Sequence, residues 1–181
     1  MGLAVSQRSD KLINLFATEF ARFWTGYPVL DHGKQIRYPL HISNIADALV
    51  LLTRTTMAIE GKTFELAGPK GYTYRRLVEL FAYASMSPCN ITSLPAPLFW
   101  LYGKVFPEIR RAPFPYDTIL QVGESERVTK DALGMRDLGF GRLEALEDHM
   151  LQMARRYRRT ADFGTPLVFP KELLQDSTRS W

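Results

Sequence analysis

Hydrophobic positions recur along the chain with two periods, one typical of strands and one typical of helices. Alternation with period two predicts strands at Ile36–Ile42, Lys62–Ala67 and Asn90–Leu94. Helical spacing predicts long helices at Ser9–Trp24, Asn44–Met57, Thr73–Ala84 and Leu143–Arg159, and short ones at Asp117–Val122 and Lys130–Leu133. Helices that alternate with strands along one chain are typical of an α/β domain.

Several residues indicate where these elements begin and what they bury. Pro39 removes a backbone donor from the first strand, so an edge position or a bend is expected there. Asn44 is placed to cap the helix that follows, whose buried stripe should include Leu49. Gly68–Gly71 is expected to be a loop, and Thr73 to cap the next helix.

The segment 94–106 is almost continuously apolar or aromatic, and a basic loop bounded by prolines follows it. Two interpretations are open. The segment is a buried helix beneath that loop, or it is a surface that contacts a protein partner or an anionic lipid interface, where aromatic and cationic side chains are typical. In the second interpretation the contacting residues are Trp100, Lys104, Arg110 and Arg111.

The last long helix has its acidic residues near its start and four arginines at its end, including Arg155 and Arg156. This polarity complements the helix dipole. The same arginines are candidates for contact with an acidic or phosphate-bearing partner. We divide the chain into one domain-like unit, residues 1–160, and an extended tail, residues 161–181, which we expect to lie over the surface of another chain.

Composition narrows the class of protein. The chain has 181 residues, of which 46% are hydrophobic, and a formal net charge of +4. These values are ordinary for a globular domain, and the charge is too weak to indicate nucleic-acid binding. Cys89 is the single cysteine, which excludes an internal disulfide. No apolar stretch reaches the length of a transmembrane helix, so a soluble or peripheral protein is expected.

The motifs of common enzymes are missing from the sequence. No glycine-rich dinucleotide fingerprint follows a strand, and no tyrosine has a lysine four residues later, the pair that a short-chain reductase needs. The nearest pair is Tyr72 with Arg76. His32, His41 and His149 do not have the spacing of a metal motif, and we expect structural roles for them. The sequence therefore offers no catalytic or metal-binding residues, and it does not identify the residues of a cofactor site.

The order of the elements nevertheless resembles the second half of extended short-chain dehydrogenases. The resemblance rests on the helix after Thr73 and on four stretches: Lys34–Ala48, Gly61–Pro69, Lys130–Gly134 and Asp137–Phe140. A narrower likeness is to the dehydrogenase-like accessory subunits of mitochondrial respiratory complex I. It rests on Arg8–Ala17, on Leu94–Phe99 and on Leu138–Phe140 followed by Ala154–Arg158, in order over residues 7–160.

The resemblance implies the C-terminal portion of a Rossmann-like fold, without the N-terminal half that binds the dinucleotide. It also implies a non-catalytic accessory subunit on the matrix side of the mitochondrial inner membrane, which braces the junction between the two arms of complex I. NADP(H) would be bound only if a separate chain supplies the missing half. The alternative is one half of a split NAD(P)-dependent reductase or sugar-nucleotide epimerase.

Overall fold

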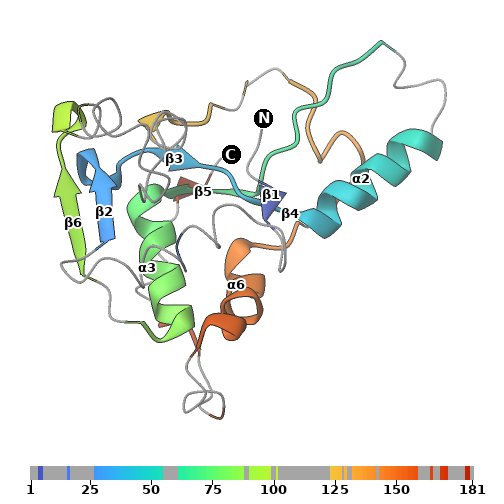
Figure 1. Ribbon diagram of the computed structural model, residues 1–181. Helices are drawn as coiled ribbons and strands as arrows, with labels where there is room; N and C mark the ends of the chain where they lie inside the picture. Colours follow the sequence, from blue (N-terminus) through green and yellow to red (C-terminus); the bar gives the residue numbers. More distant parts are fainter. Residues whose placement is uncertain are drawn as a thin grey trace.

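The computed structural model describes residues 4–5, 16, 27–54, 61–87, 90–98, 101, 123–127, 129, 132–141, 143–158, 164, 168–170 and 178–179. Helices and strands are mixed, as expected for an α/β protein (Figure 1). The helices α3 and α6 lie side by side below β3, β5, β1 and β4, and β2 and β6 lie on the other side of α3 from α6. The helix α2 extends away from the rest of the molecule.

The described strands are short and form three small sheets. Two of these sheets are parallel pairs, and the third is antiparallel with the order β3-β5-β7. The first pair joins β1 (Ala4–Val5) to β4 (Leu40–His41), and the second joins β2 (Tyr27–Leu30) to β6 (Ile91–Leu94). The antiparallel sheet consists of β3 (Ile36–Arg37), β5 (Lys70–Thr73) and β7 (Thr178–Arg179).

The predicted strand Ile36–Ile42 is interrupted at Pro39, so that β3 and β4 belong to different sheets. Gly68 lies against this break and donates its backbone N–H to the carbonyl of Tyr38 at 3.2 Å. A Cβ atom at Gly68 would lie 2.0 Å from the Pro39 oxygen, so only glycine fits. The bend expected from Pro39 is therefore confirmed. The segment that passes close to this bend needs a glycine at position 68.

The helix α2 (Ile42–Arg54) begins before the position predicted from the sequence. Asn44 is not a cap, because it lies within the first turn and is buried. The buried positions of the helix are Asn44 and Ala48, whereas Leu49 is 55% exposed. The burial predicted for Leu49 is wrong, because the helix meets the molecule along a neighbouring stripe.

The helix α3 (Tyr74–Ser85) confirms its prediction closely. The Thr73 hydroxyl accepts the backbone N–H of Arg76 at 3.2 Å, which caps the helix. Its apolar stripe, which includes Leu77 and Phe81, is fully buried. The predicted loop Gly68–Gly71 ends earlier, because its last two residues pair within β5.

The other predictions are met in part. The strand Asn90–Leu94 is confirmed as β6, whereas Lys62–Ala67 contributes an isolated bridge between Phe64 and Leu133. The described residues of 130–133 are not helical. The last helix is shorter than expected, with α6 at Leu146–Ala154 and the 3₁₀ turn η2 at Arg155–Tyr157. The short helix predicted at 117–122 lies outside the described residues.

Buried apolar side chains form two clusters. The larger joins β2, α3 and α6, and it includes Phe16, which is helical and whose ring lies 5.7 Å from that of Tyr27. Phe16 is the one described residue of the helix predicted at 9–24. The smaller cluster contains Leu40, Ala48, Met135 and Leu138.

The described parts of the tail lie on this chain. The Tyr83 hydroxyl donates to the carbonyl of Val168 at 2.9 Å, and Phe169 is buried with its ring 5.5 Å from that of Tyr83. Thr178–Arg179 pairs with β5. For these residues the expectation of a surface on another chain is wrong, because α3 and β5 provide the surface.

Candidate functional site

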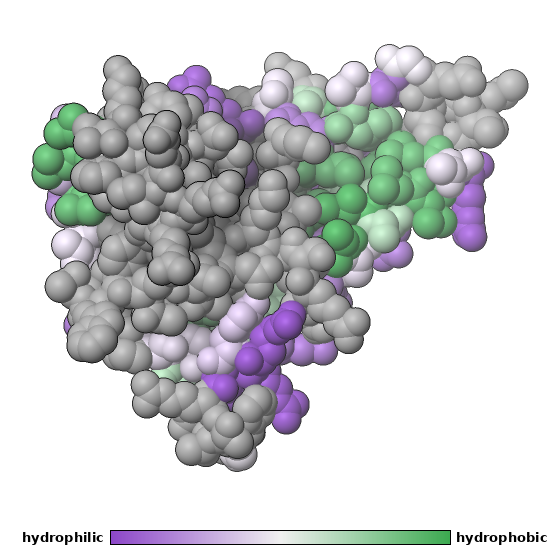
Figure 2. All heavy atoms as spheres, viewed as in Figure 1, coloured by the Kyte–Doolittle hydropathy of each residue, from purple (hydrophilic) through white to green (hydrophobic). Residues whose placement is uncertain are grey.

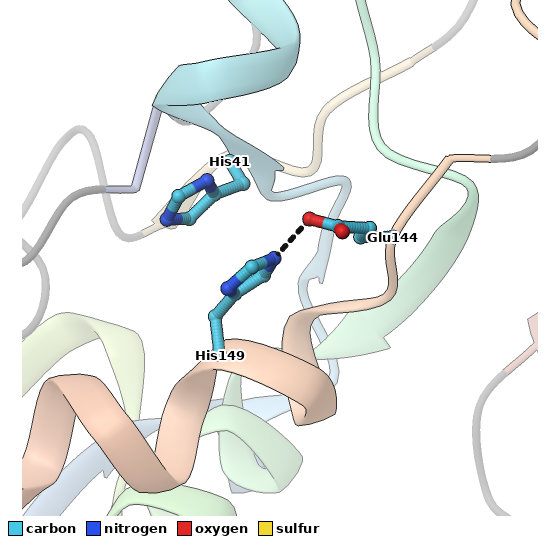
Figure 3. A group of neighbouring side chains, drawn as sticks. All are labelled: His41, Glu144 and His149. Carbon is cyan, nitrogen blue, oxygen red and sulfur yellow. Dashed lines mark hydrogen bonds and ion pairs between the residues drawn. The ribbon is translucent and has the colours of Figure 1, made fainter.

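Three polar side chains meet where the end of β4 approaches the start of α6: His41, Glu144 and His149 (Figure 3). The neighbouring buried residues fix two of these positions. Leu40, which precedes His41, is 1% exposed, and Met150, which follows His149, is 0% exposed. The backbone beneath each imidazole is therefore anchored in a hydrophobic cluster, and the two partly buried rings face each other.

The two imidazole rings are stacked, with centroids 3.9 Å apart and planes inclined by 12°. His149 Nε2 lies 2.5 Å from the Glu144 carboxylate. His41 Nδ1 lies 2.6 Å from the Ser43 hydroxyl. One ligand atom from each of His41, Glu144 and His149 lies within 4.8 Å of the others, so among the described residues this group is able to hold a metal ion.

The electrostatic surroundings keep His41 neutral. Partial burial and the positive charge available to His149 lower the pKa of His41 below its ordinary value of 6.5, and the carboxylate of Glu144 opposes this shift. A neutral imidazole has a free lone pair on one ring nitrogen, which is the form that binds metals. At neutral pH His41 is therefore in its ligand form.

A second polar group lies inside the molecule. The Tyr72 hydroxyl donates to the carboxylate of Glu147, and Lys70 Nζ contacts the other carboxylate oxygen at 3.2 Å. Glu147 is 7% exposed, so its charge depends on these two partners. Burial, followed by the negative charge of Glu147, raises the pKa of Tyr72 far above its usual range. This group links β5 to α6. The hydrogen bond of Tyr72 to Glu147 gives the tyrosine a structural role, and no catalytic role is needed to explain its position.

The helix α2 carries exposed apolar residues on one side, which define the apolar face of α2: Ile42, Leu49 and Val50. Figure 2 shows a hydrophobic area over this helix, on the side of the molecule where α2 extends outward. Water-exposed apolar patches of this kind are typical of surfaces that bind another protein or a membrane.

The interface residues predicted from the sequence are only partly described. Trp100, Lys104, Arg110 and Arg111 lie outside the described residues. Arg155 and Arg156 are exposed in η2, and the Arg156 guanidinium lies 5.5 Å from the centroid of the Tyr157 ring. The contact predicted for these two arginines stays a prediction.

The aromatic segment 94–106 is described at its start. A helical stretch begins at Ala96, between Pro95 and Pro97. Leu98 and Leu101 are 55% and 58% exposed. A wholly buried helix does not fit these two residues, so the interpretation as a contact surface is favoured for them.

Sequence reasoning missed the group formed by His41, Glu144 and His149. The two histidines are far apart in the sequence, and no spacing rule joins a residue at a strand end to one in a distant helix.

No model of a known protein family matches the chain, and no curated protein sequence matches it. Of the helices in the described part of the chain, none combines the length and the apolar character that crossing a bilayer requires.

Proposed function

We propose that the chain is a non-catalytic accessory subunit of mitochondrial NADH:ubiquinone oxidoreductase (complex I), bound peripherally to the inner membrane on the matrix side. Its role would be to brace the junction between the peripheral arm and the membrane arm. The observation that carries the proposal is the apolar face of α2, on which Ile42, Leu49 and Val50 are each about half exposed. Such a face is costly in water and is stabilised when a partner covers it.

The sheets give further support. Among the described strands, β2 pairs with β6 alone and β1 pairs with β4 alone. Parallel sheets are usually larger and covered on both faces, so two-stranded parallel pairs suit a protein whose neighbours complete them. The proposed partners are other complex I subunits, including a separate chain with the N-terminal dehydrogenase-like half. NADP(H) would be bound between that chain and this one.

The test replaces one apolar residue of α2 in the full-length protein in cells. Leu49→Lys places a charge on the apolar face, and Asp47→Lys places the same side chain at an exposed position that is already polar. We expect the wild-type chain and Asp47→Lys to migrate with the large complex that has NADH:quinone activity in native gels of mitochondrial membranes. Leu49→Lys should be lost from that complex.

Thermal unfolding of both purified variants separates loss of assembly from loss of folding, because Leu49 and Asp47 are exposed and should leave stability within about 0.5 kcal/mol. Recovery of the wild-type chain in a small soluble assembly that turns over a nicotinamide substrate would contradict the proposal. That result would support the split reductase or epimerase instead.

A further inference from the structure

We propose that His41, His149 and Glu144 bind one Zn²⁺ ion and thereby join the end of β4 to the start of α6. Two imidazole nitrogens and one carboxylate oxygen form a ligand set that suits zinc. One ligand atom from each residue already lies within 4.8 Å of the others (Figure 3). This site is independent of the proposed function.

Zinc binding requires the three ligand atoms to move only a short distance toward one another. Zinc bonds to nitrogen and oxygen of about 2.0–2.2 Å in a tetrahedron place neighbouring ligand atoms roughly 3.4 Å apart. The ligand atoms must therefore approach by about 1.5 Å at most. The Glu144 side chain, which is 57% exposed, has the freedom to move. The rings of His41 and His149 must rotate out of their stacked arrangement so that their lone pairs converge.

The surroundings of the ligands support a positive ion. Glu144 and Asp148 bring two carboxylates to the start of α6, which offset the positive end of the helix dipole. Ser43 lies within hydrogen-bonding distance of His41 Nδ1, at 2.6 Å. In the structure Nδ1 also accepts the backbone N–H of Ser43 at 3.4 Å, so zinc binding through Nε2 requires the tautomer with the proton on Nδ1. In that tautomer Nδ1–H would donate a hydrogen bond to the Ser43 hydroxyl, which would orient the ring, as partners of metal-bound histidines commonly do.

The ion would connect the two hydrophobic clusters. Leu40, next to His41, belongs to the smaller cluster, and Met150, next to His149, belongs to the larger. A metal bond across this junction stabilises the folded state, because the ligands are far apart in the unfolded chain. Three protein ligands leave a fourth tetrahedral position for water.

The experiment measures Zn²⁺ binding to the full chain, purified with EDTA and then dialysed free of it. Isothermal titration with ZnCl₂ should give one site, and Zn²⁺ at about 100 times its Kd should raise the Tm by about 5–10 °C. MgCl₂ at the same concentration should give neither effect, because Mg²⁺ prefers oxygen ligands.

Three variants and one control locate the site. His41→Gln and His149→Gln should abolish the binding, and Glu144→Gln should weaken it at least tenfold. The control is His32→Asn, which removes an exposed histidine in η1 (Asp31–Gly33), and asparagine tolerates the positive φ at that position. Each variant's Tm without metal shows whether it is folded. The proposal is overturned if wild-type protein binds no Zn²⁺, or if His32→Asn reduces binding as much as His41→Gln.

Discussion

The ring of His41 lies parallel to the ring of His149, at a centroid distance of 3.9 Å. Two protonated imidazoles at this distance would repel each other, so the folded state favours a neutral His41. Glu144 faces the same pair and partly compensates the second charge. The junction between β4 and α6 is therefore expected to respond to protons.

Lowering the pH should destabilise the protein through His41. Its pKa is lowered in the folded state, so the unfolded chain binds more protons once the pH falls below the ordinary value of 6.5. Above that pH this group adds no pH dependence, and below it the free energy of unfolding decreases. Urea unfolding in EDTA at pH 7.5, 6.5 and 5.5 measures the effect. The decrease should be smaller in His41→Gln, and an unchanged pH dependence in this variant would refute the assignment.

Tyr72→Phe should lower the free energy of unfolding by about 1–3 kcal/mol, because it removes a donor from the buried carboxylate of Glu147. Tyr83→Phe is the matched control. The Tyr83 hydroxyl donates to a neutral carbonyl, that of Val168, near the surface, so the loss should stay below about 1 kcal/mol. Chemical denaturation at pH 7.5 measures both. Equal losses would show that Glu147 does not depend on Tyr72.

Thr73→Ala should destabilise the protein by about 1 kcal/mol, because the backbone N–H of Arg76 loses its acceptor at the start of α3. Thr53→Ala removes the same hydroxyl from an exposed position near the end of α2, and its effect should remain within about 0.5 kcal/mol. Urea midpoints of the two variants provide the comparison. A larger loss from Thr53→Ala would contradict the capping role of Thr73.

Ala48→Leu should cost about 1–3 kcal/mol, because Ala48 is fully buried against the smaller cluster and has no room for a larger side chain. Ala46→Leu is the control, since Ala46 is exposed on the same helix. Thermal unfolding of the two purified variants measures the difference. If Ala46→Leu lowers the stability more than Ala48→Leu does, α2 buries the side that carries Ala46 and not the side that carries Ala48.

Local signals explain which parts of the fold were predictable. Thr73 and the stripe through Leu77 and Phe81 define α3 within a dozen residues, and the structure agrees. Asn44 shows the limit of such signals, because a residue suited to a cap is instead buried inside α2. The stacking of His41 on His149 depends on where β4 meets α6, and no pattern within either segment contains that information.

The unequal burial of α2 and α3 also has a consequence for local unfolding. The buried residues of α2 are Asn44 and Ala48, whereas α3 buries nine of its residues. Local unfolding of α2 should therefore require much less free energy than global unfolding, and its amide hydrogens should exchange first. A partner that covers this helix would protect those amides from exchange. In native-state hydrogen exchange, binding would therefore appear as slower exchange of α2, which would no longer be the first helix to exchange.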